Sequence, residues 1–173
     1  MFSALVSTHW NPNNSSEFSD TCYSSWNQRN DISKNAIING AESIAGGERK
    51  VKNVNNGYYC FKSDEQSYIS HANRDGWIQI DLQKPYPLKC LRVGSGDSFH
   101  NIEFRFGNYS RNEEKSIRMN DVIGFTSKGW GRKIAEFCPG YSMIGRFIQI
   151  ESKKPNPKVT QQVHIGEIQV LVD

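Results

Sequence analysis

The chain has 173 residues, a length that predicts one domain with a short additional segment. Its net charge is only +3, from 21 basic and 18 acidic residues, and the basic residues are scattered along the chain. A nucleic-acid partner is not expected, because binding one would need lysine and arginine gathered on one face. No transmembrane segment is expected either, because no run approaches the roughly 20 consecutive apolar residues of a membrane span.

The first part of the chain, residues 1–33, predicts an irregular N-terminal extension. It is rich in serine, asparagine and aspartate, and it shows neither the period of a strand nor that of a helix. We expect it to lie over the rest of the chain through its isolated aromatic side chains, or to be partly mobile. It lacks a basic start followed by a long apolar stretch, so a signal peptide is not predicted. The compartment stays open between secretion and the cytoplasm.

The remainder, residues 34–173, predicts an all-β domain. Apolar residues alternate with polar ones in short runs, so that Ile78, Ile80 and Leu82 share one face, as do Ile102, Phe104 and Phe106. Turn clusters separate the runs. Strands are predicted at residues 35–38, 77–82, 88–93, 102–106, 121–125, 133–137, 145–150 and 167–172. About eight short strands at this spacing favour an antiparallel β-sandwich or jelly roll.

The four cysteines leave their redox state open. Cys22, Cys60, Cys90 and Cys138 form no CxxC pair and do not cluster with histidine, which disfavours a zinc site. Their even number allows two disulfides, including a link between Cys22 and Cys60 if the protein is exported, and it equally allows four free thiols. The simpler expectation is four free thiols, with Cys90 a small buried residue of a strand.

Two stretches resemble a known family. Residues 76–88, with the sequence Ile80-Asp81-Leu82 followed by Tyr86, resemble the signature of discoidin-type (coagulation factor C-type) domains. Residues 137–150, with a Cys-Pro pair and Met-Ile-Gly-Arg-Phe, and the closing residues 166–170 resemble F-type lectins, which bind fucose. The resemblance extends over about residues 34–173, and it implies a discoidin-like, galactose-binding-domain-like sandwich with a carbohydrate-binding role.

The resemblance also implies a sugar site in the loops at one end of the sandwich. His71 falls at the position of the family's loop histidine, but the next loop lacks the family's two arginines. Arg74 and His100 are nearby donors that can replace them, with Asp97 as an acceptor and Phe99 as an apolar platform. The alternative is that all five are ordinary loop residues, and the fucose specificity of the family is not expected.

A structural calcium ion is a second implication of the resemblance, held by hard oxygen ligands. The matching positions are Lys52, Asn55, Gly57, Ser67 and Glu167, of which Lys52 and Gly57 would contribute backbone carbonyls. Asn55 stands where the family has aspartate, so the site loses a charge. Calcium is therefore expected to bind weakly or not at all.

Three residues of the motifs are predicted to be structural. We expect Trp77 to fill the core and Asp81 to accept hydrogen bonds within a turn. By the resemblance, Arg146 is a framework arginine.

No catalytic motif is present in the sequence. It contains no G-x-S-x-G elbow, no HExxH and no phosphate-binding loop, so an enzyme is not predicted. The expected function is a lectin-like module that binds a glycan or glycoprotein. The alternative is a discoidin-like adhesion or scaffold module without sugar binding, which contacts a protein partner, or a membrane surface through Tyr58, Tyr59 and Phe61. A homo-oligomer would increase the avidity of either.

Overall fold

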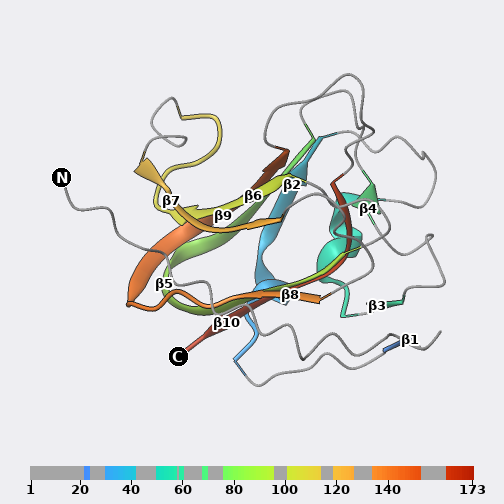
Figure 1. The fold of residues 1–173 in the computed structure, drawn as a ribbon, viewed down its shortest axis with the longest axis horizontal. Helices are drawn as coiled ribbons and strands as arrows, with labels where there is room; N and C mark the ends of the chain where they lie inside the picture. The colour runs from blue at the N-terminus through green and yellow to red at the C-terminus, as the bar shows by residue number, and fades with distance from the viewer. Residues whose placement is uncertain are drawn as a thin grey trace.

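The chain folds as an antiparallel β-sandwich in the computed structural model (Figure 1). The structure describes residues 30–41, 50–57, 76–95, 101–113, 119–126, 134–152 and 163–173, together with the backbone of residues 22–23, 59–60 and 68–69. No helix in this part of the chain is long and apolar enough to cross a membrane.

Ten strands and two short 3-10 helices make up the described fold. The strands are β1 (Cys22–Tyr23), β2 (Ile37–Gly40), β3 (Tyr59–Cys60), β4 (Tyr68–Ile69), β5 (Trp77–Ser95), β6 (Ile102–Gly107), β7 (Asp121–Thr126), β8 (Ile134–Phe137), β9 (Met143–Ser152) and β10 (His164–Val172). The 3-10 helices are η2 (Ser33–Asn35) and η3 (Val51–Asn55).

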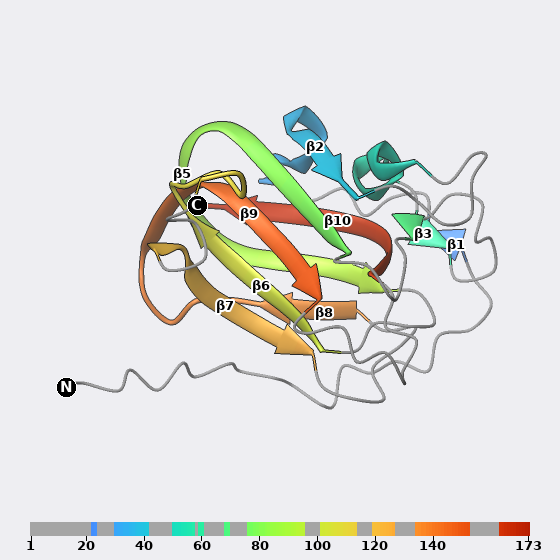
Figure 2. The same cartoon turned by 90° about the horizontal axis from the view of Figure 1, so that it is seen from above.

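The long strand β5 joins the two layers of the sandwich. Its first half pairs with β2 on one side and β9 on the other, and β6 and β7 extend this first layer beyond β9. Its second half pairs with β10 and β8, and β4 extends this second layer beyond β10. The ladder to β9 shifts register between Asp81 and Tyr86, and there the strand bends back on itself (Figure 2).

The predicted apolar faces form the core between the layers. The side chains of Ile78 and Ile80 in β5 and of Phe104 and Phe106 in β6 are fully buried, which confirms the alternation read from the sequence. Across the core, the ring of Phe137 in β8 packs on Phe104 with 4.4 Å between centroids. This contact ties the second layer to the first.

The predicted strands are confirmed, although the ends of several of them differ; β9 and β10, for example, begin two and three residues earlier than predicted. The runs at 77–82 and 88–93 belong to the single strand β5, because Gln83 takes a left-handed conformation (φ 68°) that bends the chain without ending the strand. The first strand of the body begins at Ile37 and not at Asn35, because residues 33–35 form η2. Upstream of η2, Asp31 already bridges to Leu171 of β10.

One disulfide corrects the expectation of free thiols. Cys90 in β5 and Cys138, directly after β8, are joined with 4.2 Å between their Cα atoms. The β5–β8 ladder brings them together, because Leu91 lies opposite Phe137 and the two cysteines are the next residues along. The β1–β3 ladder sets the backbone of Cys22 opposite that of Cys60, and the link between these two stays a prediction.

Candidate functional site

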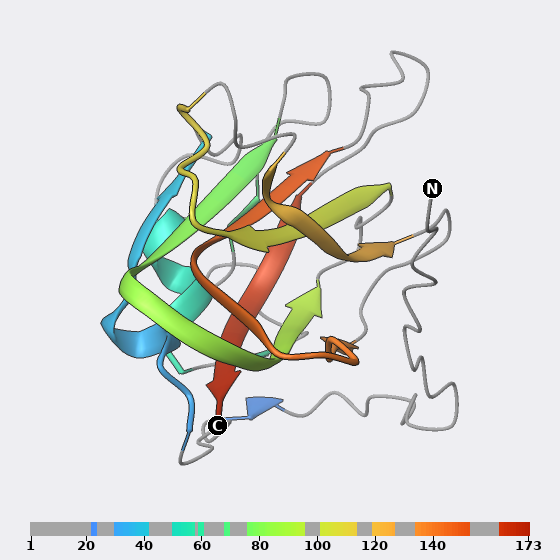
Figure 3. The ribbon, with the colours of Figure 1, turned by 90° about the vertical axis from the view of Figure 1, so that its left-hand side faces the viewer.

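Several connections leave the sandwich from one end, here called the loop end. In the first layer, the start of β5 and the start of β6 flank the end of β9, since Trp77 pairs with Glu151 and Ile102 with Ser152. In the second layer, the end of β5 and the end of β4 flank the start of β10. Figure 3 shows the start of β5 and the end of β9 toward the top, with the bend of β5 at the lower left and the C-terminus at the bottom.

The residues expected to bind sugar belong to two of these connections. The connection with His71 and Arg74 runs from the end of β4 to the start of β5, and the connection with Asp97, Phe99 and His100 runs from the end of β5 to the start of β6. Both pairs of anchoring strand ends lie at the loop end. The five residues themselves lie outside the described residues.

Ser67, among the expected calcium ligands, also falls outside the part of the chain that the structure describes. The same holds for Tyr58 and Phe61, and Tyr59 is described in backbone only, so the alternative of a membrane contact through these residues lies outside the described side chains.

A tryptophan–arginine pair lies at the loop end on the outer face of the first layer. The Cζ atom of Arg111 is 4.4 Å from the centroid of the Trp77 ring, and Arg111 Nε donates a hydrogen bond to Glu151 Oε1 at 2.9 Å. The expectation that Trp77 fills the core is wrong. Because Ile78 points inward, its neighbour in the strand must point outward. Sequence reasoning missed Arg111, which lies far from Trp77 along the chain.

Glu167 of β10 is the most unusual titratable group among the described residues. Its side chain is 1% exposed, although carboxylates are rarely buried without partners. One oxygen, Oε1, accepts a hydrogen bond from the backbone N–H of Gly57 at 3.0 Å, whereas Oε2 has no hydrogen-bond partner within the described part of the chain. A buried oxygen of this kind needs a proton, a water molecule or a cation beside it.

The electrostatics of Glu167 favour a neutral carboxyl group in the absence of a cation. Burial raises its pKa to about 9, and the negative charge of Asp31 acts in the same direction. The hydrogen bond from Gly57 and the positive charge of Lys34 lower the pKa but do not offset burial. Calcium binding here would therefore have to displace a proton.

Three of the expected calcium residues, Asn55, Gly57 and Glu167, come together around β10. Asn55, at the end of η3, donates from Nδ2 to the backbone oxygen of Ser33 at 2.8 Å, which leaves its side-chain oxygen available to a ligand. With Glu167 Oε2 and the backbone carbonyls of η3, this gives hard oxygen donors of the type that calcium takes. The residues present therefore fit a cation site with a single carboxylate at its centre.

Ser33 and Asp31 were not anticipated beside this cluster. Ser33 is fully buried and its hydroxyl oxygen, like Glu167 Oε2, has no hydrogen-bond partner among the described residues. Asp31 Oδ1 accepts hydrogen bonds from the backbone N–H groups of Ser33 and Val170 at 2.9 and 3.0 Å. Only the fold brings these residues to η3, so no pattern in the sequence could have identified them.

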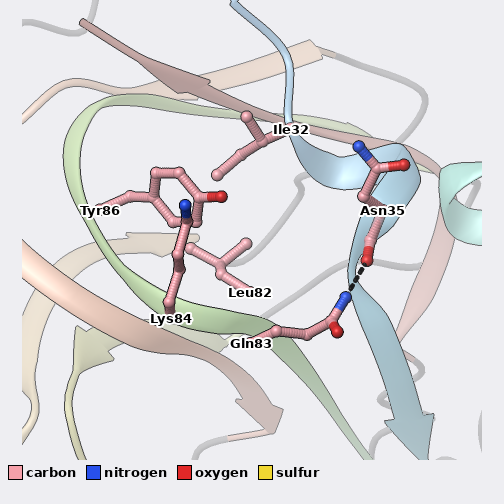
Figure 4. Close-up of a pocket in the computed structure, with 6 residues that line it drawn as sticks. All are labelled: Ile32, Asn35, Leu82, Gln83, Lys84 and Tyr86. Atoms are coloured by element: carbon pink, nitrogen blue, oxygen red, sulfur yellow. Dashed lines mark hydrogen bonds between the residues drawn. The ribbon is translucent and has the colours of Figure 1, made fainter.

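A pocket of about 280 Å³ opens at the bend of β5, away from the loop end (Figure 4). Gln83 Nε2 donates to the backbone oxygen of Asn35 at 2.6 Å at its edge, and the ammonium of Lys84 lies 5.2 Å from the centroid of the Tyr86 ring. Ile32 and Leu82 supply apolar lining. None of the residues expected to bind sugar or calcium lines this pocket.

The sulfur atoms of Cys90 and Cys138 lie close to the carboxylate of Glu136, a grouping that could suggest a metal site. The disulfide between the two cysteines removes both thiolate ligands. Glu136 instead accepts a hydrogen bond from Arg92 Nε at 2.8 Å. The grouping is therefore structural.

Comparison with known proteins identifies the fold. No family model matches the sequence, and no curated protein matches it. Among solved structures, a fucolectin from Morone saxatilis (striped bass) serum matches with a TM-score of 0.68 and 14% identity, over 83% of this chain and 48% of that one. The chitosan-binding module 1 of a chitosanase/glucanase from Paenibacillus sp. IK-5 matches with a TM-score of 0.62 and 13% identity, over 81% of this chain and 97% of that one.

The lectin domain of lectinolysin, solved with Lewis B antigen, matches with a TM-score of 0.58 and 14% identity, over 85% of this chain and 99% of that one. At these identities the likeness concerns the fold. The chain has the β-sandwich architecture of F-type lectins and discoidin-like modules, as its motifs predict.

Proposed function

We propose that this chain is a non-catalytic, glycan-binding module that recognises a saccharide through its loop end. Lectins and a chitosan-binding module share its fold, which supports carbohydrate binding in general terms. Fold alone does not carry function, so the proposal also needs residues of suitable chemistry in one place.

The observation that carries the proposal is the common origin of two connections. The strand ends that anchor the connection with His71 and Arg74 lie at the same end as those that anchor the connection with Asp97, Phe99 and His100. Three nitrogen donors, a carboxylate and an aromatic ring suit the hydroxyls and the apolar face of a sugar. We assign His71, Arg74 and His100 as donors, Asp97 as the acceptor and Phe99 as the platform.

A glycan array tests the proposal. The purified chain should bind a limited set of glycans, and His71→Ala and Arg74→Gln should each weaken that binding roughly tenfold or more, because each removes a hydrogen-bond donor. The matched control is Lys89→Gln, since Lys89 is exposed near the C-terminus and pairs loosely with Asp173 at 3.8 Å. This variant should bind like the wild type.

If the chain binds none of the glycans on the array, the proposal is contradicted. In that case the alternative of an adhesion or scaffold module gains support, and light scattering after size-exclusion chromatography would show whether the chain self-associates. If both loop variants bind glycans as tightly as the wild type, the binding site lies away from these loops.

We also infer a weak structural calcium site at Glu167. Glu167 Oε2 and the side-chain oxygen of Asn55 would hold the ion, with the backbone carbonyls of Lys52 and Gly57 and the hydroxyl of Ser67. The buried, unpartnered oxygen of Glu167 supports this assignment. A bound ion would brace η3 against β10 at that point.

A further inference from the structure

The position of Lys34 bears on the proposed calcium site. Gly57, which donates to Glu167 Oε1 at 3.0 Å, has a backbone φ of +80° and no side chain. A Cβ atom on Gly57 would lie 3.5 Å from Cε and 3.6 Å from Nζ of Lys34. The ammonium of Lys34 therefore lies directly against the residue that hydrogen-bonds Glu167.

The backbone that carries Lys34 is held to both sides of the site. Its neighbour Ser33 accepts a hydrogen bond from Asn55 Nδ2 at 2.8 Å, which ties η2 to η3. The N–H of Ile32 donates to the backbone oxygen of Val170 at 2.9 Å, which ties the same segment to β10. Lys34 is thus anchored beside Glu167 through its backbone, even though the residue itself is exposed.

Besides the neutral Asn55 at the place of the family's aspartate, a positive charge near Glu167 disfavours a divalent cation. Glu167 and Asp31 are the carboxyl groups whose charges interact there, and Lys34 brings a positive charge that acts on Glu167. Asn55 is neutral. A positive charge close to a divalent ion lowers the affinity of the site for that ion, even where solvent and salt screen the repulsion strongly.

The geometry points to Lys34 as the residue that sets the calcium affinity of this site: its ammonium repels the ion that Glu167, Asn55 and the η3 carbonyls would otherwise hold. This inference rests on the calcium site proposed above and is independent of glycan binding. It predicts that calcium affinity depends on the charge at position 34 rather than on the shape of the side chain.

Calcium titration of the whole chain, followed by calorimetry and by the melting temperature, tests the inference. Lys34→Gln and Lys34→Met should each bind Ca²⁺ at least tenfold more tightly than the wild type and melt at a higher temperature when Ca²⁺ is added. Lys34→Arg keeps the charge and should bind as weakly as the wild type. Lys89→Gln, which removes a distant charge, should also leave the affinity unchanged.

The outcomes separate the inference from the proposals on which it rests. Equal calcium affinity in the wild type, Lys34→Gln and Lys34→Met would overturn the role of Lys34 and leave the calcium site standing. No calcium binding in any variant would overturn both. A glycan array on Lys34→Gln reports separately on sugar binding, because Lys34 belongs to neither sugar-binding loop.

Discussion

Arg146 donates two hydrogen bonds to Asp81, from Nε to Oδ1 at 2.6 Å and from Nη2 to Oδ2 at 2.8 Å. Asp81 Oδ1 also accepts the backbone N–H of Gln83 at 2.7 Å, at the point where β5 bends. The expectations that Asp81 caps a turn and that Arg146 is a framework residue are both confirmed. One carboxylate thus holds the left-handed residue of the bend and connects it to β9.

Removing this ion pair should destabilise the bend. We expect Asp81→Asn and Arg146→Gln each to lower the free energy of unfolding modestly, because solvent screens an ion pair whose arginine side chain is 41% exposed. Urea denaturation at pH 7 measures the loss. The loosely paired surface variant Lys89→Gln is the control and should change stability by less than about 0.5 kcal/mol.

The same pair makes stability sensitive to acid. The hydrogen bond from Arg146 lowers the pKa of Asp81 below its ordinary value of 3.8, against a smaller opposing effect of burial. The stabilisation is therefore fully present above that value and is lost as the pH falls through the lower pKa of the folded state. The stability difference between wild type and Asp81→Asn should shrink between pH 5 and about pH 2, and a constant difference would contradict this account.

The sequence specifies the strands well because burial follows a period of two, as in β6, where Ile102, Phe104 and Phe106 all face the core. It does not specify that β5 continues through its bend, because Gln83 to Pro87 has the composition of a turn and is held by the distant residues Arg146 and Asn35. The outward position of Trp77 follows from the same alternation, because its neighbour Ile78 faces the core, and only its contact with Arg111 needed the fold.

Of the candidate sites, only the residues that belong to a family motif could be predicted from the sequence. Asn55, Gly57 and Glu167 were identified by resemblance, and they do lie around β10. Lys34, Ser33 and Asp31 belong to no motif and reach the same place through η2 and its hydrogen bonds to β10 and η3. Their contribution to the charge of the site therefore needed the fold.

A side chain at Gly124 should separate the layers. A Cβ atom there would lie only 2.1 Å from Cδ1 of Phe137, whose ring also packs on Phe104. We expect Gly124→Ala to lower the free energy of unfolding by about 3 kcal/mol, measured by urea denaturation. Gly140→Ala is the matched control, because nothing lies within 4 Å of its Cβ position. Equal stability of the two variants would show that Phe137 does not pack on Gly124.

Loss of the Cys90–Cys138 disulfide should destabilise the chain through its unfolded state. The two cysteines are 48 residues apart, and closing a loop of that length is worth about 4 kcal/mol in the chain-entropy treatment. The double variant Cys90→Ala/Cys138→Ala should show this loss in urea. Peptide mapping without reductant should recover the 90–138 link and, as the β1–β3 register predicts, a link between Cys22 and Cys60. Free thiols at 90 and 138 in the folded protein would contradict the structure.

Glu167 should make the calcium-free chain less stable as the pH rises. Its pKa is raised from 4.5 to about 9, chiefly by burial, so the folded state holds a proton that the unfolded state has released. The favourable contribution is complete below the unfolded value of 4.5 and is lost progressively as the pH approaches 9. In the presence of a chelator, the melting temperature of the wild type should therefore fall from pH 5 to pH 9 more steeply than that of Glu167→Gln, whose amide does not titrate.

The matched control is Glu113→Gln, which removes an exposed carboxylate and should keep the wild-type slope. If Glu167→Gln instead retains the full slope, the Glu167 carboxyl is already ionised in the folded chain, and a partner other than a proton must satisfy Oε2.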